Sequence, residues 1–170
     1  GTRYIQVHCL KGYSTKIKVN YGKDKSKMLT KGKVKKTKNF NLRNYGISNL
    51  KNVELVHARA EEFGQNKKYR EKFDISTSRA VANLSTLSEY LIPLVKENGK
   101  IICMKASEAE EEIEQAKKAI NVLGGTIKNV ETFDLPQSDI GRTIITIEKT
   151  KKTPAKYPRK AGTPSKEPIK

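Results

Sequence analysis

The first 52 residues of this 170-residue chain have almost no negative charge. Residues 1–52 hold fourteen Lys and Arg residues against one acid, Asp24, for a net charge of +13, whereas residues 53–170 have a net charge of +4. A total of +17 favours a polyanionic partner. The remaining excess lies mostly in residues 149–170, which carry eight Lys and Arg against Glu167. This distribution predicts a near-neutral body with a basic tail that docks on nucleic acid.

Long apolar runs and metal-ligand spacings are also missing. No apolar stretch approaches the roughly 20 residues that a membrane-spanning helix needs, so no membrane association is expected. The two cysteines, Cys9 and Cys103, share no ligand spacing with His8 and His57, so we expect no zinc or other metal site. We expect free thiols in a reducing, cytoplasmic location.

Hydrophobic periodicity is weak before Asn49 and clear after it. Arg3–Cys9 and Ile17–Tyr21 are candidate strands, whereas Lys23–Lys38 has little to bury and fits a solvated or disordered segment. The chain is therefore divided into an atypical Lys-rich segment (1–45), an ordered α/β part (46–149) and a basic, proline-rich tail (150–170).

From Asn52 onward, strands alternate with helices. The strands are predicted at Asn52–His57, Phe73–Thr77, Lys100–Met104, Thr126–Leu135 and Arg142–Ile147. The helices are predicted at Ala60–Phe63, Ala80–Val95 and Ser107–Leu123. Asn98-Gly99 is expected to end the second helix, Ser107 to cap the third, and Glu110–Glu112 to be solvated. This order predicts parallel βαβ units with an antiparallel hairpin at the C-terminal edge.

Four segments resemble the RsmG family, also called GidB, the bacterial 7-methylguanosine methyltransferases of small-subunit ribosomal RNA. They are Asn52–Phe63 (NVELVHARAEEF), Phe73–Leu84 (FDISTSRAVANL), Leu91–Met104 (LIPLVKENGKIICM) and Lys152–Ile169 (KTPAKYPRKAGTPSKEPI). The resemblance covers about Gly46–Lys170. It implies a class I SAM-dependent methyltransferase (Rossmann-like) fold with an incomplete N-terminal half. It also implies methyl transfer from S-adenosylmethionine (SAM) to guanine N7 in 16S rRNA by a cytoplasmic monomer.

The resemblance implies three cofactor contacts. The Ala-Glu pair that lies against the adenosine of SAM in this family corresponds to Ala60 and Glu61, and the Arg of the Ser-Arg-Ala segment corresponds to Arg79. All three follow strands, where doubly wound sheets bind ligands. Two plainer interpretations stay open. Glu61 would complement the helix dipole, and Arg79 would form a surface ion pair with Glu71 or Asp74.

The candidate RNA contacts are Lys105, Arg142, Lys156, Tyr157, Arg159 and Lys160. Tyr157 is expected either to stack on a base while its neighbours meet phosphates, or to anchor the tail across the sheet edge. No catalytic base is assigned, because guanine N7 is already a nucleophile and catalysis is largely positioning.

The family's glycine-rich loop, of the Asp-x-Gly-x-Gly-x-Gly-Phe-Pro kind, is missing. At the corresponding place residues 1–10 read GTRYIQVHCL, which lacks the glycines that let the backbone approach SAM. Gly12–Lys16 (GYSTK) displaced by one base would read Gly-Ile-Pro-Leu-Lys, which the family has just after its loop. We therefore interpret roughly residues 1–43 as translated out of frame and expect the chain to be inactive. The alternative is a non-catalytic basic RNA-binding module in which residues 1–52 act as an electrostatic arm.

Overall fold

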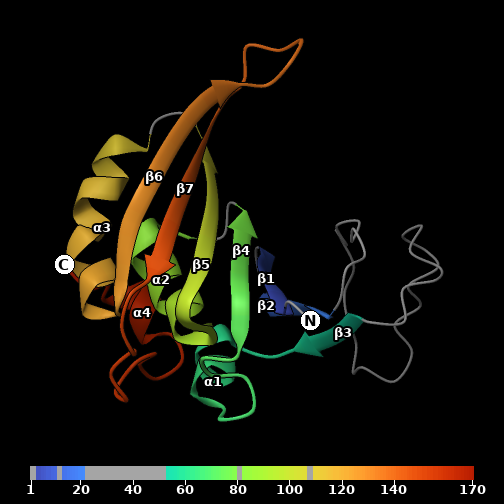
Figure 1. Ribbon diagram of the computed structural model, residues 1–170, viewed down its shortest axis with the longest axis vertical. Helices are drawn as coiled ribbons and strands as arrows, with labels where there is room; N and C mark the ends of the chain where they lie inside the picture. Colours follow the sequence, from blue (N-terminus) through green and yellow to red (C-terminus); the bar gives the residue numbers. More distant parts are fainter. Residues whose placement is uncertain (1–2, 11–12, 22–52, 80–81, 107–108) are drawn as a thin grey trace.

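The computed structural model describes residues 3–10, 13–21, 53–79, 82–106 and 109–170. They form a seven-stranded sheet in the order β3-β2-β1-β4-β5-β7-β6 (Figure 1). The strands are β1 (Arg3–Leu10), β2 (Tyr13–Tyr21), β3 (Val53–His57), β4 (Phe73–Arg79), β5 (Val95–Ala106), β6 (Gly125–Asp134) and β7 (Gly141–Lys149). The first five positions follow the strand order of the doubly wound α/β fold, which confirms the predicted fold class.

The C-terminal edge of the sheet is antiparallel, as predicted. Strands β1, β4 and β5 run parallel to one another, whereas β7 runs antiparallel to both β5 and β6. Figure 1 shows the β6–β7 hairpin extending beyond the carboxyl ends of β4 and β5. No helix lies between β6 and β7, so the chain returns through a hairpin.

The N-terminal strands depart from a parallel doubly wound sheet. The predicted strands Arg3–Cys9 and Ile17–Tyr21 are confirmed as β1 and β2, but β2 is antiparallel to both β1 and β3. Only two residues separate β1 from β2, too few for the crossover of about a dozen residues that parallel strands require. The predicted solvated segment Lys23–Lys38 lies outside the described residues.

The helices are α1 (Ala60–Gln65), α2 (Leu84–Leu91), the 3₁₀ turn η2 (Ile92–Leu94), α3 (Glu110–Val122) and α4 (Thr163–Lys166). Helix α2 is shorter than the predicted Ala80–Val95. Its start is set by Asn83, whose side chain accepts a hydrogen bond from Ser85 N at 3.0 Å. Its end is set by Pro93, which lacks an N–H group and is part of η2.

Strand β5 is longer than predicted, because it begins at Val95 rather than Lys100. Asn98 and Gly99 lie inside this strand, so the prediction that they end a helix is wrong. Asn98 has a positive φ of 64°, and the register of β5 against β4 shifts at this point. The Asn-Gly pair therefore marks an irregularity within the strand, and pairing with β4 overrides the local turn signal.

Helix α3 begins at Glu110 with Ala109 at its N-cap, so the predicted cap at Ser107 is wrong. Ser107 itself lies outside the described residues. At the other end the predicted boundary at Leu123 is confirmed, because Leu123 is the C-cap residue. Gly124 follows α3 with a φ of 94°, a left-handed conformation that glycine adopts without strain.

In β4, β5 and β7 buried side chains alternate with more exposed ones, whereas most of β6 is exposed. Strand β7 shows this alternation most clearly, since its buried side chains are Thr143, Ile145, Ile147 and Lys149. The buried face contacts apolar side chains of α2 and α3, including Leu87, Leu91, Ala116 and Ile120. Figure 1 shows α3 alongside β6 and β7. No helix in the described part of the chain is long and apolar enough to cross a membrane.

The tail after β7 packs over the helices and is irregular apart from α4, as predicted. Its C-terminal part lies along α2, where Ser85 Oγ donates to Ile169 O at 2.6 Å and Thr86 Oγ1 donates to Pro164 O at 2.9 Å. These bonds explain why the polar face of α2 is buried.

A buried lysine holds the start of the tail. The side chain of Lys149 is 0% exposed, and its Nζ donates to Glu71 Oε1 at 3.0 Å, Ile92 O at 3.0 Å and Thr153 Oγ1 at 2.6 Å. Glu71 Oε1 also accepts from Thr153 N at 2.9 Å. Burial alone would raise the pKa of Glu71, but the hydrogen bonds from Thr153 and Lys149 and the Lys149 charge hold it below its ordinary value.

Candidate functional site

The carboxyl ends of β4 and β5 form the edge at which a doubly wound sheet binds ligands. Arg79 is the last residue of β4 and lies opposite Met104 of β5 in the ladder. Its side chain is exposed. Of the three predicted cofactor contacts, Arg79 is therefore the one that the structure leaves open at this edge.

A lysine–carboxylate clasp holds the same edge. Lys105 Nζ lies 2.5 Å from Glu112 Oε1 and donates to Ala82 O at 2.7 Å. Glu112 Oε1 also accepts from Leu84 N at 2.5 Å. Together these contacts join β5 and α3 to the connection between β4 and α2, which follows Arg79.

The clasp revises what the sequence indicated about two residues. Glu112 is not part of a solvated run, because its side chain is 22% exposed and holds Lys105. Lys105, a predicted RNA contact, is 11% exposed and forms an ion pair with Glu112. In this arrangement Lys105 positions the loop after Arg79, and its contact with RNA stays a prediction.

Ala60 and Glu61 begin helix α1, and both are buried. Glu61 Oε1 accepts a hydrogen bond from Gly162 N at 2.8 Å, and Gly162 belongs to the tail. No hydrogen bond or ion pair joins either residue to Arg79 among the residues that the structure describes. The structure therefore ties Glu61 to the tail, a role that neither sequence interpretation included.

The open alternative for Arg79, a surface ion pair with Glu71 or Asp74, is not seen. Glu71 is bound to Lys149, and Asp74 pairs with Lys96. Both acids lie near the start of β4, at the opposite end of the strand from Arg79. The guanidinium of Arg79 is therefore not bound to either candidate acid.

The tail residues predicted to contact RNA fall into two groups. Arg159 is bound inside the protein, where its Nε and Nη2 donate to both carboxylate oxygens of the buried Glu89 at 2.8–3.2 Å. Tyr157 is 8% exposed and belongs to the hydrophobic core, as the anchor interpretation predicted. Lys156 and Lys160 are exposed, and Lys156 Nζ lies 5.1 Å from the Tyr157 ring centroid.

Arg142, the remaining predicted RNA contact, lies at the start of β7 near the same edge as Arg79. It is half-buried, and its Nη1 donates to Gly141 O at 2.8 Å. Ladder pairing places Arg142 opposite both Ala106 and Phe133. The structure thus brings Arg142 and Lys105 to the carboxyl edge, whereas the tail residues lie elsewhere, over α1 and α2.

Two buried hydroxyl groups of β4 lie near this edge. The Oγ atoms of Ser76 and Ser78 have no hydrogen-bond partner among the described residues. Ser78 directly precedes Arg79 at the ligand edge. Successive side chains of a strand point to opposite faces, so the buried Ser78 hydroxyl and the exposed Arg79 guanidinium lie on different faces of the sheet. Buried polar atoms normally have a partner, so the orphaned hydroxyls fit a bridging water, and the exposed Arg79 guanidinium is the group that fits a polar ligand. Ala60 and Glu61 do not fit in the same way, because Ala60 is buried and Glu61 is bound to Gly162.

Other reactive groups are not arranged for chemistry. Cys103 is a buried free thiol whose pKa burial raises to about 12, so it is not a nucleophile at neutral pH. Across the described part of the chain, no three His, Cys, Asp or Glu residues are grouped so that they hold a metal ion.

A family model described as GidB, rRNA small subunit methyltransferase G, matches residues 21–140. The chain belongs to the GidB family. This confirms the predicted family, and the GidB match begins before Gly46, where the resemblance begins in the sequence alone. Together with the sheet order, membership in the GidB family gives the class I SAM-dependent methyltransferase fold.

Relatives named "Ribosomal RNA small subunit methyltransferase G" support the same family. Over 120 residues the chain is 56% identical to the protein of Oceanobacillus iheyensis, 58% to that of Geobacillus sp. and 54% to that of Bacillus subtilis. Each match covers 71% of this chain and 50% of the relative. The chain therefore spans about half the length of the curated relatives it matches.

Solved structures show weaker likenesses. The crystal structure of the antibiotic-resistance methyltransferase Kmr has a TM-score of 0.43 and 16% identity, over 56% of this chain and 61% of that one. A methyltransferase from Pyrococcus furiosus has a TM-score of 0.35 and 17% identity, over 46% of this chain and 41% of that one. Both TM-scores are below 0.5, so the fold assignment rests on the sheet order and the family match.

Proposed function

We propose that this fold serves SAM-dependent methyl transfer to guanine N7 in small-subunit (16S) ribosomal RNA. The observation that carries the proposal is the family match over residues 21–140, with relatives of that name 54–58% identical. The RNA substrate, the cofactor and the position of the methyl group come from the family. A cytoplasmic location and a monomeric state remain predictions.

The carboxyl edge supports this proposal. SAM, when bound, supplies an electrophilic methyl group, and guanine N7 needs no strong base to attack it. The protein's task is therefore positioning. Arg79 presents an exposed guanidinium at this edge. The Lys105–Glu112 clasp holds the connection that follows Arg79 in place.

We further propose that this chain has lost most of the activity. The resemblance places the glycine-rich loop where residues 1–10 read GTRYIQVHCL. In the structure this segment is β1, and it returns directly as the antiparallel β2. Glu61 is bound to Gly162, so a cofactor contact by its carboxylate would require the tail to release it.

The test compares this chain with a chimera in which residues 1–52 are replaced by the corresponding segment of the Bacillus subtilis relative. Calorimetry measures SAM affinity, and radiolabelled SAM with unmodified 16S rRNA measures methyl transfer. We expect the chimera to bind SAM and methylate guanine N7, and the natural chain to do neither. Arg79→Ala in the chimera should abolish transfer, whereas Lys118→Ala, an exposed residue of α3, should not.

Two results would overturn the proposal. One is a chimera that binds SAM but methylates no small-subunit RNA, or methylates another atom. The other is a natural chain that binds RNA in a salt-sensitive way while neither it nor the chimera binds SAM, which would favour the basic RNA-binding module.

A further inference from the structure

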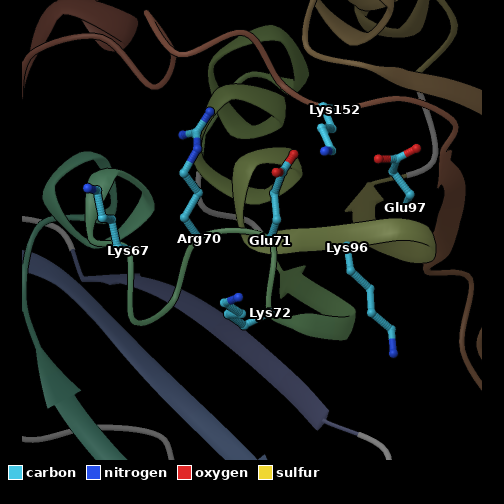
Figure 2. A pocket seen from close by; sticks show the side chains of 7 residues that line it. All are labelled: Lys67, Arg70, Glu71, Lys72, Lys96, Glu97 and Lys152. Atoms are coloured by element: carbon cyan, nitrogen blue, oxygen red, sulfur yellow. The ribbon is translucent and has the colours of Figure 1, made fainter.

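A hollow lies at the opposite edge of the sheet from Arg79, where β4 and β5 begin and β7 has just ended (Figure 2). Its volume is about 470 Å³, within the range of small-ligand sites. Figure 2 shows that its lining comes from the α1–β4 connection, the start of β5 and the tail. Its basic residues are Lys67, Arg70, Lys72, Lys96 and Lys152.

Internal pairing neutralises part of this charge. Of the two acids in the lining, Glu71 is already bound to the buried ammonium of Lys149. Lys96 pairs with Asp74 beside the hollow. Glu97, the second acid of the lining, is exposed. The lining therefore keeps an excess of positive charge after these pairs are counted.

Three lysines account for that excess. Lys67, Lys72 and Lys152 are exposed, and none of their ammonium groups forms a hydrogen bond or ion pair with another residue that the structure describes. They come from two segments far apart in the sequence, the α1–β4 connection and the tail. The fold thus gathers ammonium groups that the sequence keeps apart, although like charges repel.

Arg70 holds the two segments together. Its Nη1 donates to Tyr157 O at 2.6 Å, and its Nη2 donates to Thr153 O at 2.9 Å. The guanidinium is therefore used to fix the tail backbone beside the α1–β4 connection. This fixes the backbone next to Lys152 in the same hollow that Lys67 and Lys72 line. A pre-ordered set of charges loses less entropy when it binds an anion.

We propose that Lys67, Lys72 and Lys152 bind backbone phosphates of the RNA substrate at the amino edge of the sheet. Exposed lysines are hydrated point charges that suit phosphate contacts and carry no base specificity. The site would hold a part of the RNA away from the guanine, which is expected at Arg79. The identity of the polyanion rests on the proposed function, whereas the site itself rests on the charges and the hollow.

The experiment measures the affinity of the full chain for a labelled 16S rRNA fragment as a function of salt concentration. The test variant is Lys67→Gln with Lys72→Gln and Lys152→Gln. The matched control removes the same charge from α3 and β6, by Lys117→Gln with Lys118→Gln and Lys128→Gln. All six side chains are exposed, so both variants should fold. A plot of log affinity against log salt has a negative slope, and each lost phosphate contact makes it shallower by about 0.7–0.9. The loss of three contacts in the test variant should therefore make the slope shallower by about 2.

The expected result is an affinity roughly tenfold or more below that of the natural chain at physiological salt in the test variant, with a much smaller loss in the control. Equal losses in both variants would show a general charge effect and overturn the site. Binding of inorganic tripolyphosphate is measured as well. The assignment to RNA is overturned if tripolyphosphate binds the natural chain as tightly as the RNA does and does not bind the test variant. If RNA binding depends on the three lysines but the chimera transfers no methyl group, the site stands and the proposed function fails.

Discussion

Two lysine–carboxylate pairs lie at opposite edges of the sheet and differ in what they hold. Lys149 and Glu71 lie at the amino edge, and Lys105 and Glu112 lie at the carboxyl edge. In both pairs the lysine also donates to a backbone carbonyl, and the carboxylate also accepts from a backbone N–H. The amino-edge pair fastens the tail, and the carboxyl-edge pair fastens the connection after Arg79.

The difference between the pairs lies in their burial. Lys149 is 0% exposed and has three acceptors, whereas Lys105 is 11% exposed and has two. A fully buried ammonium requires its partners, because an unpaired charge away from water is very unfavourable. The ammonium of the amino-edge pair is therefore fully enclosed, whereas water still reaches the ammonium of the carboxyl-edge pair, and the two carboxylates are about equally exposed.

The largest effect is expected from Lys149→Ala. This change leaves Glu71 without its ammonium and frees the acceptors of Thr153 and Ile92, so it should lower the free energy of unfolding by about 3–5 kcal/mol. Urea unfolding measures the loss. Lys151→Ala removes an exposed lysine of the same segment and should have little effect. If both variants lose the same stability, the bonds of Lys149 to Glu71 and Thr153 do not stabilise the fold.

A smaller effect is expected from Lys105→Ala at the carboxyl edge. The loss should be about 1–2 kcal/mol, because Glu112 keeps its bond to Leu84 N and can be hydrated. Hydrogen exchange near Ala82 should become faster, since the clasp no longer holds that connection. The control is Lys117→Ala, whose ion pair with Glu114 is exposed and should contribute less than about 1 kcal/mol. If Lys105→Ala lowers the free energy of unfolding as much as Lys149→Ala does, the two pairs do not differ in their contribution to stability.

The smallest effect is a pH dependence at the amino edge. The pKa of Glu71 is lowered in the folded state, so its contribution to stability is complete above the ordinary value of 4.5 and is lost as the pH falls through the lowered value. Glu71→Gln should therefore lose less stability than the natural chain over this acid range. Glu62→Gln, which removes an exposed carboxylate of α1, should leave the acid dependence unchanged. If the curves of stability against pH are identical for all three proteins, the Glu71 carboxylate does not contribute to the acid dependence of stability.

Local patterns in the sequence were sufficient for most elements after Asn52. Strands β4, β6 and β7 and helix α1 lie where alternation and turn residues predicted them. The error at Asn98 arises because turn residues also occur inside a strand when pairing extends past them, as the pairing of β5 with β4 does from Lys100 onward. A signal for Lys149 was present as well. It follows Ile145 and Ile147 at the same two-residue spacing, on the buried face of β7.

The sequence by itself determined the family, the order of the elements after Asn52 and the charge asymmetry, because each of these depends on residue types or neighbouring positions. Only the tertiary structure decided which charges are free. Arg159 binds Glu89 across 70 positions, Lys149 binds Glu71 across 78, and Gly162 binds Glu61 across 101. Such pairings depend on how distant segments pack, and no local pattern encodes them. For that reason the predicted contacts Glu61, Lys105 and Arg159 are engaged inside the protein. The ammonium groups of three unpredicted lysines at the amino edge have no partner among the described residues.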